Sequence, residues 1–128
     1  MTDLSMFDLS GKVSVVSGVG RGMGCAMSLA LASAGYDMLL GDLDEEGLKH
    51  TAGDIESMGC KGDTSTIDVS EIDQIPTSFE QLDRNFARID FLGNAAGGDV
   101  VFGAPEEISI EDFERSTKAL ITGRFLMC

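Results

Sequence analysis

Apolar and polar positions in this chain follow two alternating spacings. Short apolar runs of strand length, over residues 12–17, 37–42, 64–69 and 89–94, are separated by longer segments in which apolar residues recur every third or fourth position. The second spacing is typical of helices with one apolar face. The pattern predicts strands alternating with helices, and therefore an α/β fold built on a Rossmann-like, doubly wound parallel sheet with helices on both faces.

Helices are predicted after each of the four strands. They are expected over residues 22–34, from Asp44 to Gly59, from Pro76 onward and from Ser109 onward. Asp44 is suited to cap its helix, and the pairs Ser70/Asp73 and Ser109/Asp112 have the spacing of a capping box. The third strand is the least apolar, so it is expected near an edge of the sheet.

A glycine-rich stretch from Ser17 to Gly24 joins the first predicted strand to the first helix. Such a turn directs free backbone N–H groups and the positive end of a helix at whatever lies above it, which favours a phosphate or pyrophosphate group. Glycine suits the position because a Cβ would obstruct both the tight turn and the close approach of the backbone to an anion.

The spacing of the glycines separates several kinds of phosphate turn. A P-loop needs Lys and Ser/Thr after its last glycine, whereas Cys25 follows Gly24 here, and the G-x-G-x-x-G pattern does not fit either. The pattern that fits is G-x-x-x-G-x-G, at Gly18, Gly22 and Gly24. A glycine-rich loop without a ligand is the alternative, and the place of the loop between a strand and a helix favours the phosphate site.

Asp42 ends the second predicted strand, where a dinucleotide fold holds the adenosine ribose. A carboxylate there accepts hydrogen bonds from both ribose hydroxyls and repels a 2′-phosphate, so it favours NAD over NADP. Two alternatives stay open. Asp42 could simply open the turn that follows it, and Arg21 could pair with a 2′-phosphate and favour NADP.

Composition narrows the choice of partners. The chain has 128 residues and a net charge of −13, which disfavours nucleic acid and anionic membranes as partners. No apolar run is long enough to span a membrane. The three cysteines, Cys25, Cys60 and Cys128, form no metal-ligand pattern, so no metal site is expected. Their small, odd number suggests reduced thiols, so a cytoplasmic protein is expected. His50 is expected to be a solvated helix residue, and residues 1–11 are expected to form a mobile arm.

Four segments in this order resemble the short-chain dehydrogenase/reductase family. They are Leu9-Ser10-Gly11-Lys12, Ser17-Gly18-x-x-x-Gly22-Met23-Gly24, Asp68-Val69 and Asn94-Ala95-Ala96-Gly97. Together they span the cofactor-binding, N-terminal half of such a protein. The resemblance implies an NAD(P)-dependent oxidoreductase that transfers a hydride to or from a small alcohol or ketone, and an oligomer of identical subunits.

The resemblance also implies which residues bind the cofactor. They are Gly18, Gly20, Arg21, Gly22, Met23, Gly24, Asp42, Leu43, Asp68, Val69, Asn94, Ala95, Ala96 and Gly97. The cofactor expected in this site is NAD rather than NADP.

Departures from the family pattern concern catalysis. Ala95 replaces the second Asn of the family's Asn-Asn-Ala-Gly segment, Gly93 replaces a bulky aliphatic residue, and Leu120 stands where the family has a catalytic Asn. The family's catalytic Ser and Tyr-x-x-x-Lys segment would lie beyond residue 128, and Tyr36 is followed four positions later by Leu40 rather than by Lys.

Residues 1–128 are therefore expected to form an incomplete domain that retains only the dinucleotide-binding part. Alone it is expected to be inactive and to associate with itself. The alternative function is a non-catalytic dinucleotide-binding or interaction protein derived from the same family, while a flavodoxin-like or P-loop protein is disfavoured by the glycine spacing.

Overall fold

The structure, a computed structural model, describes residues 5–97 and 100–128. Its centre is a sheet of four strands in the order β3-β2-β1-β4, and every neighbouring pair is parallel. The strands are β1 (Val13–Ser17), β2 (Asp37–Asp42), β3 (Gly62–Thr66) and β4 (Phe91–Asn94). The predicted doubly wound, Rossmann-like fold is confirmed.

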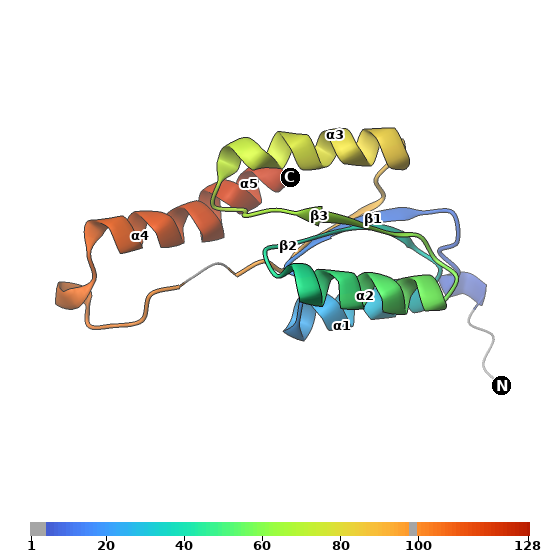
Figure 1. Cartoon of the computed structure of the whole chain (residues 1–128), viewed down its shortest axis with the longest axis horizontal. Helices are drawn as coiled ribbons and strands as arrows, with labels where there is room; N and C mark the ends of the chain where they lie inside the picture. Colours follow the sequence, from blue (N-terminus) through green and yellow to red (C-terminus); the bar gives the residue numbers. More distant parts are fainter. Residues whose placement is uncertain (1–4, 98–99) are drawn as a thin grey trace.

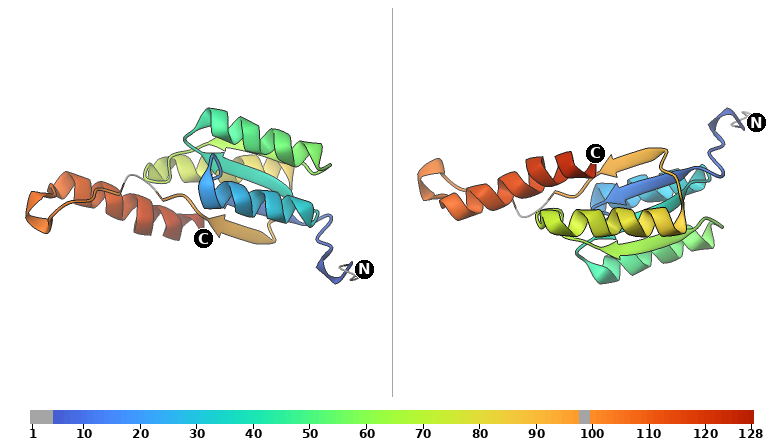
Figure 2. Two further views of the ribbon diagram at one scale, coloured as in Figure 1. Left: turned by 90° about the horizontal axis from the view of Figure 1, so that it is seen from below. Right: turned by 90° about the horizontal axis from the view of Figure 1, so that it is seen from above.

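Helices cover both faces of the sheet (Figure 1). On one face lie α1 (Gly22–Ser33) and α2 (Glu45–Ser57), and on the other lie α3 (Ile75–Asn85) and α5 (Gly123–Met127). A fifth helix, α4 (Ile110–Thr117), continues through a π-helical segment, Lys118–Thr122, into α5. Figure 2 shows that α4 projects beyond the sheet, at the end of the molecule opposite the N-terminus.

Two apolar clusters, one on each face, hold these layers together. Alternate residues of β2 serve opposite clusters: Met38 and Leu40 pack with α1 and α2, and Leu39 packs with α3 and α5. All three side chains are at most 2% exposed. Burial on both faces is what a parallel sheet between two helical layers requires, and it explains the continuous apolar run in the middle of β2.

Most predicted helix starts are confirmed. Asp44 accepts the N–H of Gly47 at 3.1 Å, Ser109 accepts the N–H of Asp112 at 3.1 Å, and a proline stands in the first turn of α3. The capping box expected at Ser70 is wrong. Its hydroxyl donates to the preceding Asp68 at 2.6 Å, so a local turn has taken the group that would have capped the next helix.

The edge position of the third strand is confirmed, but its predicted bounds are wrong. β3 occupies Gly62–Thr66, whereas residues 67–69 leave the sheet as a loop. Leu9 of the expected mobile arm donates its N–H to the carbonyl oxygen of Ala34 at 2.8 Å, which fixes the arm beside the end of α1. Residues 1–4 of that arm, and Gly98 after the fourth strand, lie outside the described residues.

Candidate functional site

A groove of about 590 Å³ runs along the carboxyl ends of the strands. The chain adds β2 and β3 on one side of β1 and then crosses over to place β4 on the other side. In an open α/β sheet, a ligand usually binds at the carboxyl ends of the strands where the strand order reverses in this way. The predicted residues that line the groove are Gly18, Arg21, Asp42, Leu43, Asp68, Val69, Ala95, Ala96 and Gly97. The other predicted residues do not line it: Gly20 in the first turn, Gly22, Met23 and Gly24 at the start of α1, and Asn94 at the end of β4.

The glycines of the first turn serve different purposes. A Cβ on Gly18 would lie 2.4 Å from the backbone nitrogen of Ala96, and a Cβ on Gly24 would lie 1.9 Å from the carbonyl oxygen of Gly18. Those two glycines let the turn fold onto itself and onto the turn after β4. Gly22 shares a positive φ with Gly18, at +61° and +79°, but differs because nothing lies within 4 Å of its Cβ position. The open side of the turn is therefore at Gly22.

Helix α1 begins without a side-chain cap. Its N-cap residue, Arg21, makes no capping hydrogen bond, and Met23 in the first turn is 80% exposed. The first N–H groups of a helix have no partner within the helix, and they form the positive end of its dipole. An anion above Gly22 would meet these uncapped groups directly.

Asp42 lies at the end of β2 with both carboxylate oxygens engaged. One oxygen accepts the N–H of Gly20 at 2.7 Å, and the other accepts the N–H of Asp44 at 2.9 Å. Asp42 therefore does open the next turn, as the alternative interpretation held, and it also lines the groove. The two roles are compatible, because each carboxylate oxygen has a second lone pair for a further donor.

The turn after β4 is held by residues from two other elements. The Ser17 hydroxyl oxygen, at the end of β1, accepts the N–H of Ala96 at 3.4 Å, and the Arg124 guanidinium on α5 donates to the carbonyl oxygen of Ala96 at 3.0 Å. Asn94 donates to the carbonyl oxygen of Arg124 at 3.4 Å. Within the described residues, Oδ1 of Asn94 is buried without a hydrogen-bond partner.

Two residues after the fourth strand reach the groove and were missed by the sequence analysis. Arg115 and Ala119 line it from the side of α4, and Arg115 also pairs with Asp112 at 2.9 Å. Their four-residue spacing places both on one face of the helix, and that spacing was the available sign. Gly123 brings the helix close to the loop after β3, since a Cβ there would lie 1.9 Å from the carbonyl oxygen of Val69.

Comparison with known proteins identifies the family of the chain. Residues 12–128 match the family described as short chain dehydrogenase. The chain belongs to this family. It is 32% identical over 123 residues to D-threitol dehydrogenase of Mycolicibacterium smegmatis, covering 95% of this chain and 46% of that protein. The chain thus spans about half the length of the curated relatives it matches.

Solved structures of the short-chain dehydrogenase family overlay closely on the chain. A short-chain type dehydrogenase/reductase from Mycobacterium marinum is 30% identical with a TM-score of 0.88, covering 99% of this chain and 51% of that one. An NAD⁺-bound xylitol dehydrogenase is 30% identical with a TM-score of 0.86, covering 92% and 45%.

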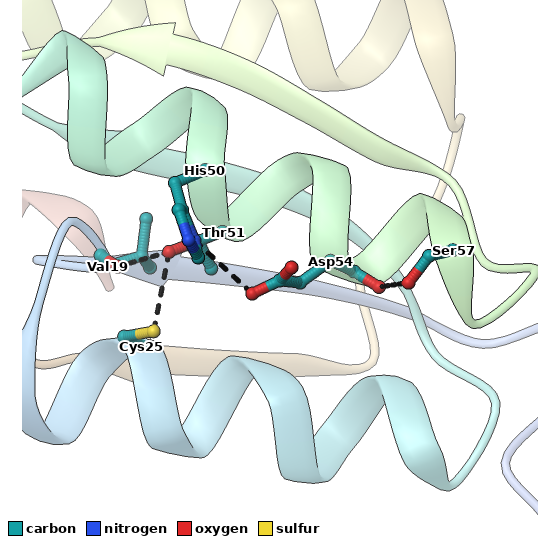
Figure 3. Close-up of polar contacts among 6 residues, drawn as sticks. All are labelled: Val19, Cys25, His50, Thr51, Asp54 and Ser57. Carbon is teal, nitrogen blue, oxygen red and sulfur yellow. Dashed lines mark hydrogen bonds and ion pairs between the residues drawn. The ribbon is translucent and has the colours of Figure 1, made fainter.

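Three residues that the sequence analysis weighed for catalysis, Tyr36, His50 and Leu120, do not line the groove. Tyr36 is 7% exposed and packs in the core between the sheet, α1 and α2. The His50 side chain is 77% exposed and pairs with Asp54 at 3.3 Å, as expected of a solvated helix residue (Figure 3). Leu120 is half-buried within the π-helical segment. In the described part of the chain, no group of three or more acidic, His or Cys residues could hold a metal ion.

Proposed function

We propose that the chain is the dinucleotide-binding part of an NAD(P)-dependent oxidoreductase of the short-chain dehydrogenase family. The observation that carries this proposal is the uncapped start of α1, which lies beside the groove that Asp42 lines. The groove volume of about 590 Å³ lies in the range, roughly 300–1,000 Å³, of small-molecule sites. The open space at Gly22 is where a pyrophosphate fits.

The groove and the adjacent start of α1 each have a function in this proposal. The first-turn N–H groups of α1 bind the pyrophosphate, and the Asp42 carboxylate accepts the ribose hydroxyls. Asp68 and Val69 border the adenine, while the small side chains of Ala95 and Ala96 leave room for a flat ring. The nicotinamide of a bound cofactor supplies or accepts the hydride. The substrate would be a small alcohol or ketone, as the names of the relatives suggest for those proteins.

NAD is the cofactor proposed, in preference to NADP. Asp42 is fixed by two hydrogen bonds, so its negative charge has a defined place in the groove. Arg21 also lines the groove and could attract a 2′-phosphate, but its side chain is exposed and makes no hydrogen bond or ion pair within residues 5–97 and 100–128. An exposed charge is screened by solvent, so we expect the fixed carboxylate to dominate.

A non-catalytic dinucleotide-binding or interaction protein is the second candidate. Leu120 favours it, because leucine cannot hold a proton or a water at the position where the resemblance implies a catalytic Asn. A cytoplasmic location and a homo-oligomer remain proposals for either candidate. No helix of the described residues is both long and apolar enough to cross a membrane.

Titration of the chain with NAD⁺ tests the binding function. We expect saturable binding, with NMR shifts concentrated at the amides of residues 18–24, 41–44, 68–69 and 94–97. Gly53→Ala is the control, since nothing lies within 4 Å of its Cβ position and it stands in α2 away from the groove. The proposal fails if millimolar NAD⁺ causes no saturable shift. Reading the coding sequence beyond codon 128 separates the two candidates, because an open frame with Tyr-x-x-x-Lys supports the enzyme and a stop codon supports the binding protein.

A further inference from the structure

One peptide unit of the glycine turn is held from both sides by side chains of the β2–α2 region. The carbonyl oxygen of Val19 accepts the hydroxyl of Thr51 at 3.0 Å, and the N–H of Gly20 donates to Asp42 at 2.7 Å. Since the C=O of Val19 and the N–H of Gly20 belong to the same planar peptide and point in opposite directions, the two bonds fix its orientation.

Helix α2 is pressed against this peptide over one helical turn. Gly47 and Thr51 are four residues apart and share a face of the helix. A Cβ on Gly47 would lie 2.3 Å from the carbonyl oxygen of Gly20, so α2 approaches the turn as closely as its backbone allows. The Thr51 hydroxyl donates a hydrogen bond to the carbonyl oxygen of Val19, the residue before Gly20.

The Thr51 hydroxyl is buried and has few alternative partners. Thr51 is 1% exposed, and besides Val19 its oxygen lies 3.4 Å from the sulfur of Cys25 on α1 (Figure 3). A thiol forms weaker hydrogen bonds than a carbonyl group, so the bond to Val19 is the stronger contact. Thr51 therefore joins α2, the glycine turn and the first turn of α1 at one point.

The orientation of this peptide affects what the groove presents to an anion. With Val19 held toward Thr51, its carbonyl oxygen, which carries partial negative charge, faces α2. If the peptide rotated, that oxygen could turn toward the groove and repel a phosphate at the start of α1, and Gly20, as a glycine, would resist the rotation little.

We propose that Thr51 is a positioning residue for cofactor binding, which keeps the Val19–Gly20 peptide oriented so that the turn attracts the pyrophosphate. This inference rests on the proposed function of the groove. Thr51 does not line the groove itself, so its effect passes through the peptide that it holds.

Substitutions at Thr51 isolate the hydroxyl. Thr51→Ala and Thr51→Ser differ by one oxygen, and Thr51→Val keeps the shape without the donor. We expect the Ala and Val variants to bind NAD⁺ about tenfold more weakly, in keeping with the loss of one buried hydrogen bond, and Thr51→Ser to restore the affinity.

A matched control separates positioning from a general loss of stability. Ser78 on α3 is 8% exposed and its hydroxyl shares a 2.9 Å hydrogen bond with that of Ser65, across the sheet from Thr51. Ser78→Ala removes a partly buried side-chain hydrogen bond on the other face of the sheet and should leave the NAD⁺ affinity unchanged. All affinities are compared at a temperature where circular dichroism shows each variant fully folded.

Hydrogen exchange of the Gly20 amide gives a second measurement that needs no ligand. We expect faster exchange in Thr51→Ala than in Thr51→Ser, with exchange in β1 and β2 unchanged. If the unchanged chain binds no NAD⁺, the proposed function fails. The exchange rates then still test whether Thr51 holds the Val19–Gly20 peptide in place. If it binds NAD⁺ and the Ala and Val variants bind equally well, or if Gly20 exchanges at the same rate in Ala and Ser, the positioning role of Thr51 is wrong.

Discussion

The carboxylate of Asp42 accepts the backbone N–H of Gly20 at 2.7 Å, which ties the end of β2 to the turn after β1. The residue proposed to choose between cofactors is thus also part of the scaffold of the phosphate turn. Replacing it with alanine would remove the negative charge and also leave the Gly20 N–H without its partner, so a loss of binding in that variant would have two causes.

Asp42→Asn removes the charge and can keep one of the two acceptor oxygens. An amide oxygen can take the Gly20 N–H, while repulsion of a 2′-phosphate disappears. We expect NADP⁺ to bind about tenfold more tightly, which corresponds to roughly 1.4 kcal/mol, and NAD⁺ to change by much less. Calorimetric titration of both cofactors measures the ratio.

Arg21→Gln is the companion variant for the same measurement. In the unchanged chain we expect NAD⁺ to bind one to two orders of magnitude more tightly than NADP⁺, a difference of about 1.4 kcal/mol per tenfold step. Tighter binding of NADP⁺ that is lost in Arg21→Gln would mean that Arg21, and not Asp42, determines the preference.

A side chain at Gly22 should disturb cofactor binding for two reasons, the backbone conformation at this position and the space that the pyrophosphate would occupy. Its φ of +61° is unfavourable for a residue with a Cβ, at a cost of about 1–2 kcal/mol, and the space beside it is open. Gly22→Val should abolish NAD⁺ binding while the circular-dichroism spectrum stays nearly the same. Gly53→Ala, whose Cβ position is also open, should bind normally. Undiminished binding by Gly22→Val would mean that the phosphate lies elsewhere.

The local features of this site could be predicted from the sequence, whereas its tertiary contacts could not. The glycine turn, Asp42 and the turn after β4 follow from residue types placed at the ends of apolar runs. Three helix residues contact the site or the turns that form it, namely Arg115, Arg124 and Thr51. The sequences of their helices predict which residues share a face, but not what that face contacts. Their contacts depend on how the helices pack, which no short pattern encodes.

The error at the third strand has a related cause. The apolar residues Ile67 and Val69 made residues 64–69 resemble a strand, yet both are buried in the loop that follows β3. Burial there comes from packing beneath α3 and against Gly123, and a buried loop and a buried strand have the same apolar signature.

Catalysis by the 128-residue chain alone is not expected. Among the described residues that line the groove there are carboxylates but no Tyr, Lys or His, and Leu120 stands at the position where the resemblance implies a catalytic Asn. We expect no turnover of NAD⁺ with a panel of secondary alcohols, nor of NADH with the matching ketones, followed by absorbance of the reduced cofactor. Turnover by purified chain that disappears on mutation of a groove residue would contradict this prediction.

Acid should weaken the fold partly through Asp90. Its carboxylate accepts hydrogen bonds from the Arg88 guanidinium and from the N–H of Val13. These bonds hold the pKa of Asp90 below its ordinary value, and the bond from Arg88 has the larger effect. A lowered pKa in the folded chain contributes stability above the unfolded pKa of about 3.9, and that contribution is lost as the pH falls through the folded pKa. Urea unfolding between pH 5 and pH 2 should therefore depend on pH less strongly in Asp90→Asn. Equal pH dependence in the unchanged chain and in Asp90→Asn would show that the hydrogen bonds of Asp90 do not contribute to stability.

Self-association is expected from the surfaces that the fold leaves open. Among the described strands β4 forms one edge of the sheet, and its Phe91 is 37% exposed. An open edge presents unpaired backbone groups to another chain. The helices α4 and α5 and the segment between them add exposed apolar side chains at helical spacing, namely Ile110, Phe113, Ile121 and Phe125, each more than 60% exposed. A patch of this kind usually marks a contact surface.

The net charge of −13 opposes this association, but salt screens it. We therefore expect the mass measured by light scattering to exceed that of a monomer and to rise with salt. Phe91→Lys should reduce the association, whereas Met58→Lys, which also replaces an exposed apolar residue but lies just after α2, should reduce it much less. Hydrogen exchange in β4 should slow as the concentration rises, because pairing protects the edge. A sharp monomer mass at low and high salt, together with slow exchange throughout β4, would instead mean that the edge is already satisfied and that these residues fold as a self-contained unit.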